Sequence, residues 1–143
     1  MRELPENEAE IAAAIISLER KALDRWGKGD PSGFLEISAP DVVYFDPFVE
    51  CRVDGIEELT RLYERYRGQV KLAGYELLNP NVQWIGDAAV LTFNFFSRDD
   101  DGTESRWNCT EVYRRGSEGW RIVQTHWALT QAGRSKAGLR RSF

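Results

Sequence analysis

A change in hydrophobic periodicity near residue 70 limits the fold of this chain more than any other feature. Before it, apolar residues recur at spacings of three and four, as on one face of a helix. After it, apolar and polar residues alternate as they do in strands. The change is clearest in residues 107–129, where two β-rich runs flank one tight turn and end in Thr125-His126-Trp127. A helical first half and a stranded second half predict an α+β fold with helices packed on the concave face of a curved sheet.

Three helices are expected in the first half. Residues 7–28 carry an apolar stripe that includes Ile11 and Ile15 and is flanked by charged residues such as Glu19. Asp30-Pro31 predicts a second, short helix, because Asp accepts amide bonds at a helix start and Pro fits the first helical position. Asp54 predicts the cap of a third helix that continues to about residue 66. Between the last two helices, residues 42–45 predict a short strand.

The second half predicts an antiparallel meander. Strands are expected near residues 71–78, 81–86, 88–98, 105–115 and 120–129, joined by short turns. Asn79-Pro80 interrupts the first two of these segments. Because Pro cannot donate a ladder hydrogen bond, this dipeptide indicates a sheet edge or a bulge.

Length and composition predict one ordinary domain. The 143 residues suit a single domain, with an ordered core expected at about 8–130 and a basic tail at about 131–143. A net charge of −4 argues against a nucleic-acid partner. The polar N-terminus does not resemble a signal peptide, and the apolar runs are too short for a membrane span. Two cysteines make no disulfide framework, so a cytoplasmic protein is expected.

Two residues have side chains suited to acid–base chemistry. Asp46 ends the predicted strand at 42–45, where its carboxylate would act as a general base at a pocket rim or merely bond nearby turn amides. His126 is the one histidine of the chain and would act as a proton shuttle, or would be a half-buried strand residue whose ring bonds a neighbour. It has no companions at metal-ligand spacing, so neither a metal site nor a cofactor is predicted.

Glu111 and several aromatic residues are further candidates. Glu111 lies in the middle of a strand whose same-face neighbours are mostly apolar, which favours a buried carboxyl with a raised pKa, whereas exposure would make it a cross-strand partner of arginine. Tyr44 shares a strand face with Asp46, and Tyr63 either offers its hydroxyl to Asp46 or packs in the core. Phe95 and Trp127 are either core residues or the walls of a ligand site.

Together these motifs resemble the nuclear transport factor 2-like superfamily over about residues 8–130. Within it, the chain resembles the ketosteroid-isomerase or polyketide-cyclase (SnoaL-like) branch and the calcium/calmodulin-dependent kinase II association domain. The resemblance rests on Gly29-Asp30, Tyr44-Phe45-Asp46-Pro47, Asp54-Gly55, Leu78-Asn79-Pro80, Gly86-Asp87-Ala88-Ala89 and the segments 110–115 and 120–127.

The resemblance implies a cone-shaped, strongly curved sheet with three helices, a pocket between them, and a homodimer formed through the outer sheet face. It places Asp46 inside the cone, at the position of the isomerase's catalytic Asp. The isomerase's oxyanion donors align near Ala22 and Thr110, which do not suit that role. The pocket arginines of the association domain align with Phe95, Glu111 and Trp127.

Two functions are therefore expected as alternatives. One is a small-molecule pocket of an isomerase, cyclase or dehydratase that acts on an apolar ligand. The other is a non-catalytic module for oligomerisation or ligand binding, similar to the association domain.

Overall fold

A computed structural model describes residues 7–130, so the basic tail expected at 131–143 lies outside the described residues. The helices and strands are α1 (Glu8–Trp26), α2 (Ser32–Glu36), β1 (Ser38–Phe45), β2 (Val53–Asp54), α3 (Gly55–Glu64), β3 (Leu72–Ile85), β4 (Ala88–Asp99), β5 (Glu104–Gly116) and β6 (Gly119–Leu129).

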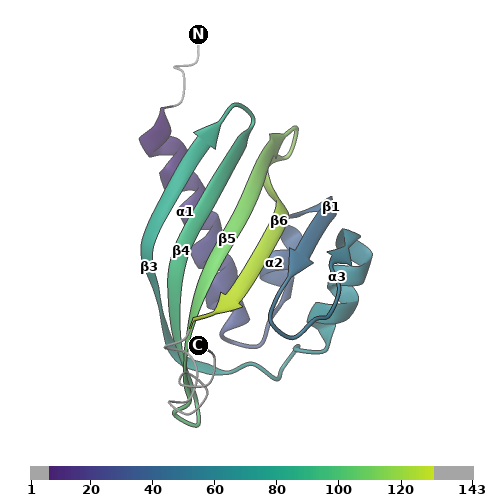
Figure 1. The fold of residues 1–143 in the computed structure, drawn as a ribbon, viewed down its shortest axis with the longest axis vertical. Coiled ribbons are helices and arrows are strands. Elements are labelled where there is room, and N and C mark those ends of the chain that lie inside the picture. Colours follow the sequence, from purple (N-terminus) through teal and green to yellow (C-terminus); the bar gives the residue numbers. More distant parts are fainter. Residues whose placement is uncertain (1–6, 131–143) are drawn as a thin grey trace, which may run out of the picture.

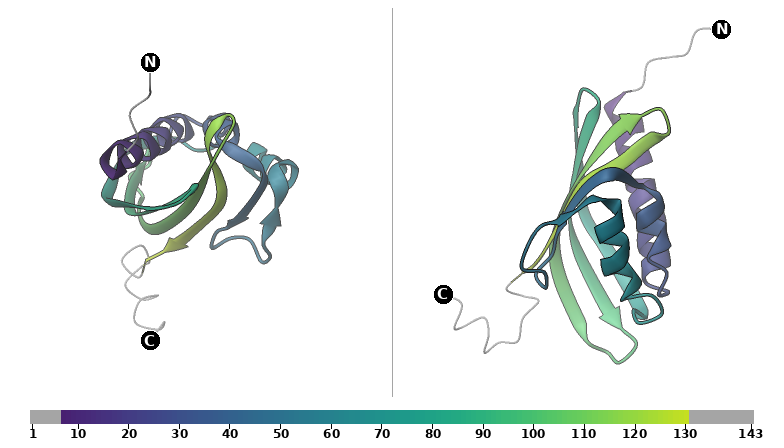
Figure 2. Two further views of the ribbon diagram at one scale, coloured as in Figure 1. Left: turned by 90° about the horizontal axis from the view of Figure 1, so that it is seen from above. Right: turned by 90° about the vertical axis from the view of Figure 1, so that its right-hand side faces the viewer.

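The strands form one mixed sheet in the order β2-β1-β6-β5-β4-β3 (Figure 1). β3 to β6 are the predicted antiparallel meander, and β1 joins it by pairing in parallel with β6. The sheet curves around α1, which packs on β3, while α3 packs on β1 (Figure 2). The predicted α+β class, with helices on the concave face of a strongly curved sheet, is confirmed.

Helix α1 follows the predicted stripe but buries one residue that was expected to flank it. Asn7 caps the helix by accepting the Glu10 amide at 2.9 Å, and Ile11 and Ile15 are fully buried. Glu19 is also 0 % exposed, so its placement among the solvated charges was wrong. It continues the spacing of four from Ile11 and Ile15, which puts it on the same helix face.

The segments predicted as separate strands at 71–78 and 81–86 form one strand, β3. The register with β4 shifts between Leu78 and Asn81, and Asn79 has a φ of 52°. β3 is also an edge strand. The Asn79-Pro80 signal thus marked both a bulge and an edge, but the bulge does not break the strand, because pairing resumes beyond it.

The start of α3 differs from the predicted capping box. Asp54 occupies the N-cap position, but its side chain makes no cap hydrogen bond and instead pairs with Arg52. The Glu58 carboxylate accepts the Asp54 amide at 2.8 Å. The helix ends at Glu64, two residues before the predicted end, and β1 starts earlier than predicted, at Ser38.

Core side chains fill the centre of the space between the helices and the concave sheet face, and they leave a hollow at one end of it. Apolar side chains from α1 and the inward faces of β4 to β6 fill the centre, among them Ile11, Ile15, Leu91 and Ile122. The hollow lies where α1, β1, β4 and β6 end and β5 begins. Among residues 7–130, each helix falls short of the length and apolar character that a bilayer crossing requires.

Candidate functional site

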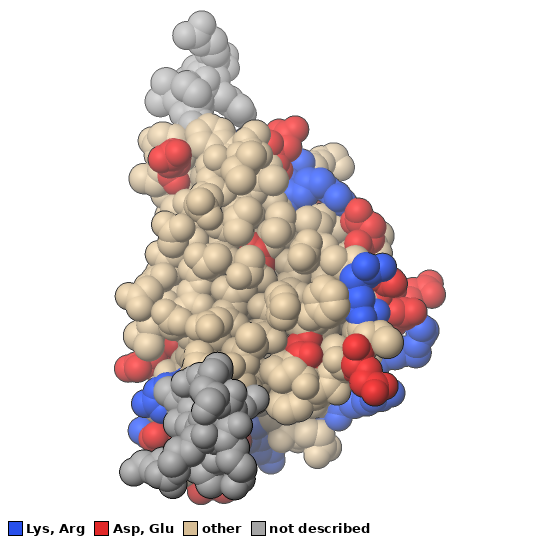
Figure 3. Space-filling model, viewed as in Figure 1, with Lys and Arg blue, Asp and Glu red and all other residues tan. Residues whose placement is uncertain are grey.

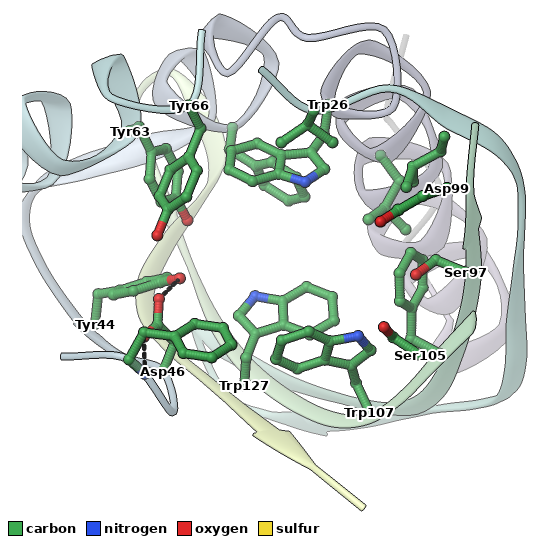
Figure 4. A pocket seen from close by; sticks show the side chains of 16 residues that line it. Trp26, Tyr44, Asp46, Tyr63, Tyr66, Ser97, Asp99, Ser105, Trp107 and Trp127 are labelled. Carbon is green, nitrogen blue, oxygen red and sulfur yellow. Dashed lines mark hydrogen bonds between the residues drawn. The ribbon is translucent and has the colours of Figure 1, made fainter. Parts of the chain in front are cut away.

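The hollow is a cavity of about 240 Å³ between the helices and the concave sheet face (Figure 4). Nine of the sixteen lining residues are aromatic: Trp26, Phe34, Tyr44, Phe48, Tyr63, Tyr66, Phe95, Trp107 and Trp127. The polar lining consists of Asp46, Ser97, Asp99 and Ser105, and the rest is aliphatic. Such a largely apolar wall with a few placed polar groups is typical of small-molecule sites.

Asp46 lies at the cavity wall just beyond the end of β1. Its Oδ2 accepts the Tyr44 hydroxyl at 2.7 Å, and its Oδ1 accepts the amides of Phe48 and Val49 at 2.7 and 3.1 Å. The carboxylate therefore bonds turn amides and lines the cavity at the same time. Three donors fix its orientation, which is what a positioned proton acceptor requires.

Tyr63 contacts this network through Tyr44 rather than through Asp46 directly. The two tyrosine rings meet edge to face at 5.5 Å. Burial raises the pKa of both hydroxyls well above the usual value, so both stay protonated donors.

Phe95 and Trp127, the predicted walls, both line the cavity. Their rings meet edge to face at 5.4 Å, and Trp107 packs edge to face against Trp127 at 6.0 Å. Trp26 and Tyr63 form a similar contact at 5.2 Å. Figure 4 shows Trp26 on the wall facing Trp107 and Trp127, so indole rings lie on opposite sides of the space.

Glu111 does not line this cavity. It is fully buried on the inward face of β5, and fully buried Glu19 faces it from α1. The Tyr113 hydroxyl donates to Glu19 Oε1 at 2.7 Å, and the Cys109 thiol contacts Glu111 Oε1 at 3.7 Å. The second oxygen of each carboxyl has no other partner among the described residues.

Protonation of one carboxyl would supply a hydrogen-bond donor for the other. Burial, followed by the charge of Glu19, raises the pKa of Glu111 well above its usual value. Its proton is donated to Glu19, and burial raises the pKa of Glu19 as well. The pair therefore holds a proton inside the fold.

His126 is not brought to the cavity. It is exposed on the outer sheet face, because Trp127 beside it points inward and neighbouring strand residues face opposite ways. Its ring packs on Phe45 at 5.2 Å. Thr110, aligned with an oxyanion donor, is likewise exposed, and the inward acid of β5 is its neighbour Glu111.

Asp99 is a cavity residue that sequence reasoning missed. The predicted strand at 88–98 stops one residue before it, but β4 extends through Asp99. The alternation Phe93, Phe95, Ser97, Asp99 puts it on the inward face, and this signal was present in the sequence. Burial, followed by the charges of Asp101 and Asp100, raises the pKa of Asp99.

Metal-ligating residues do not gather in the part of the chain that the structure describes. No group of three or more His, Cys, Asp or Glu side chains there is arranged to hold a metal ion. Cys51 is exposed and Cys109 is buried, both as free thiols.

Solved structures share this fold. A protein of Parabacteroides distasonis assigned as a candidate ketosteroid isomerase is 40% identical, with a TM-score of 0.75 over 91% of this chain and 93% of that one. A nuclear transport factor 2-like protein of unknown function from Pseudomonas putida is 21% identical, with a TM-score of 0.77 over 86% and 89%. The CaMKII association domain of C. elegans is 24% identical, with a TM-score of 0.69 over 85% and 98%.

The sequence comparisons identify a family. No match was found among curated proteins. The family described as SnoaL-like domain matches residues 20–130, which includes every cavity residue named above. The chain therefore belongs to the SnoaL-like domain family.

Proposed function

We propose that the chain binds a small apolar molecule in this cavity and catalyses proton transfer on it, as an isomerase, cyclase or dehydratase. The observation that carries the proposal is the Asp46 carboxylate, which lies in an aromatic cavity with its orientation set by three donors. The 40% identity to a candidate ketosteroid isomerase supports this class of reaction.

Each cavity residue has a role in this proposal. Asp46 is the general base, and Phe95 and Trp127 clamp the ligand. Tyr44 positions the base through its hydroxyl, and Tyr63 packs against the Tyr44 ring. Glu111 has no direct contact with the ligand in this proposal, because it does not line the cavity. His126 has no role here, since it lies on the outer face.

The test measures proton abstraction directly. We expect the protein to catalyse deuterium uptake at the carbon next to the carbonyl of an apolar ring ketone such as 2-tetralone, followed by NMR in D₂O. Asp46→Asn should slow uptake by about 10²–10⁴-fold, the usual contribution of a general base. Asp41→Asn is the control, because Asp41 is exposed on the same strand and pairs with Arg114. Equal rates for Asp46→Asn and the control would refute the role of Asp46.

A second candidate function is a non-catalytic oligomerisation module. It is supported by the fold shared with the CaMKII association domain and by the outer sheet face, where β3 to β6 present a largely uncharged surface (Figure 3). Light scattering tests the second candidate. A large ring would favour the module, whereas a dimer is compatible with both candidates.

A further inference from the structure

The cavity has an unusual balance of charge for an apolar ligand site. Two of its lining residues, Asp46 and Asp99, are carboxylates, and none of its described lining residues is Lys, Arg or His. Figure 4 shows the two carboxylates on opposite sides of the space. A ligand inside would thus lie between two negative groups, in a site where apolar walls strengthen electrostatic interactions.

The two carboxylates differ in how far the protein already satisfies them. Asp46 accepts three hydrogen bonds, from the Tyr44 hydroxyl and two amides. Asp99 uses only its backbone in local bonds: its amide donates to Thr103 and its carbonyl accepts from Gly102. Among the described residues, its side chain has no hydrogen bond or ion pair. Asp99 is therefore the carboxylate with capacity left for a ligand.

The surroundings of Asp99 favour a positive partner. Asp100 and Asp101 follow it in the β4–β5 hairpin, and both charges disfavour its ionised form. Ser97 and Ser105 lie beside it, with their hydroxyls directed into the cavity (Figure 4). A cation next to Asp99 would relieve the repulsion, whereas an anion would add to it.

The aromatic walls suit the same partner. The faces of indole and phenol rings attract cations within about 6 Å of the ring centre, and cages of such rings recognise quaternary ammonium groups. Trp26 faces Trp107 and Trp127 across the space, and Tyr66 and Phe95 complete the walls.

We propose that the cavity selects an organic cation, an apolar amine or quaternary ammonium whose charge pairs with Asp99 between the tryptophan rings. This rests on the proposed function, since it specifies the ligand class of the same cavity. The Asp46 end would then be left free for chemistry on the apolar part of the ligand.

Three probes of one shape and different charge test the proposal. Phenyltrimethylammonium is the cation, tert-butylbenzene its neutral isostere, and benzenesulfonate an anion of similar outline. Binding is followed by the fluorescence of the cavity tryptophans and by NMR titration. We expect the cation to bind about tenfold more tightly than the neutral isostere, and the anion not to bind.

Asp99→Asn should remove most of this tenfold preference while leaving the affinity for tert-butylbenzene unchanged. Asp100→Asn is the matched control, because it removes the same charge from an exposed neighbour that does not line the cavity. Circular dichroism melting checks that both variants fold.

The possible results separate the two proposals. Binding of the neutral isostere as tightly as the cation, or an unchanged preference in Asp99→Asn, would overturn the cation assignment and leave the small-molecule cavity standing. Binding of benzenesulfonate would also overturn it. If none of the three probes binds, the cation assignment is overturned, and the deuterium-uptake test on 2-tetralone decides the proposed function separately.

Discussion

At the scale of single residues, the main finding is that two carboxyl groups share a proton in the core. Glu19 and Glu111 are both fully buried, and a carboxyl pair in an apolar interior cannot hold two charges. Asp46 was predicted either to act as a base at a pocket rim or to bond turn amides. The structure shows that it bonds turn amides and also lines the cavity. One role does not exclude the other, because a carboxylate has two oxygens and several acceptor sites.

The buried pair predicts a stability that falls as pH rises. The pKa of Glu111 is raised in the folded state above the ordinary value of 4.5, so the folded state keeps a proton that the unfolded state loses. Above about pH 4.5, unfolding therefore releases this proton and is favoured by about 1.4 kcal/mol for each pH unit until the folded pKa is reached.

Glu111→Gln should remove that dependence, because its amide replaces the proton as donor to Glu19. In urea unfolding between pH 5 and 8, we expect the stability of the variant relative to wild type to increase with pH. Glu118→Gln, at an exposed turn, should show a constant difference. Parallel curves for wild type and Glu111→Gln would contradict a shared proton.

At the scale of elements, a backbone junction ties the end of α1 to the start of β3. The Gly29 carbonyl accepts the Gly68 amide at 2.8 Å, and the Gly27 carbonyl accepts the Leu72 amide at 2.9 Å. Trp26, at the end of α1, and Leu72, at the start of β3, both line the cavity. The junction therefore holds these two lining residues at a fixed separation.

Gly29→Ala should weaken the junction. Gly29 has a φ of +86°, and a Cβ there would lie 3.1 Å from the Gly68 Cα. Strained backbone of this kind costs about 1–3 kcal/mol, which a lower midpoint in urea would reveal. Gly74→Ala is the control, since no atom lies within 4 Å of its added Cβ. Equal stability of the two variants would show that the junction relaxes freely.

At the scale of the whole molecule, the two sheet faces differ in the side chains that they present. The inward face carries the core and the cavity, while the outer face of β4 and β5 presents Asn94, Asn108 and Thr110 to solvent. Asn94 donates to Asn108 at 2.8 Å, so part of this face is an ordered, uncharged ladder. An uncharged sheet face of this kind suits pairing with a second copy.

Thr110→Lys should break such a dimer, because it places two like charges in the middle of the paired faces. Light scattering should give twice the chain mass of 16.4 kDa for wild type and the single mass for the variant. Ala13→Lys, exposed on α1, should remain a dimer. A dimer that tolerates Thr110→Lys would exclude this face as the interface.

The sequence by itself determined the class of fold and the order of its elements. Hydrophobic period is a local property, and the stripe of α1 and the alternation of β4 to β6 place most core residues correctly. It also singled out Asp46, Tyr63, Phe95 and Trp127, because the motif at 44–47 and the aromatic residues are visible without coordinates.

Tertiary structure decided which of these residues meet. Glu19 and Glu111 are 92 positions apart in the sequence, and only the curvature of the sheet over α1 brings their carboxyls together. The outward placement of His126 follows from the pairing register of β6. A shift of that register by one residue would move each side chain of the strand to the opposite sheet face. The hydrophobic periodicity can be read along the chain, but strand register and sheet curvature arise from contacts between distant segments.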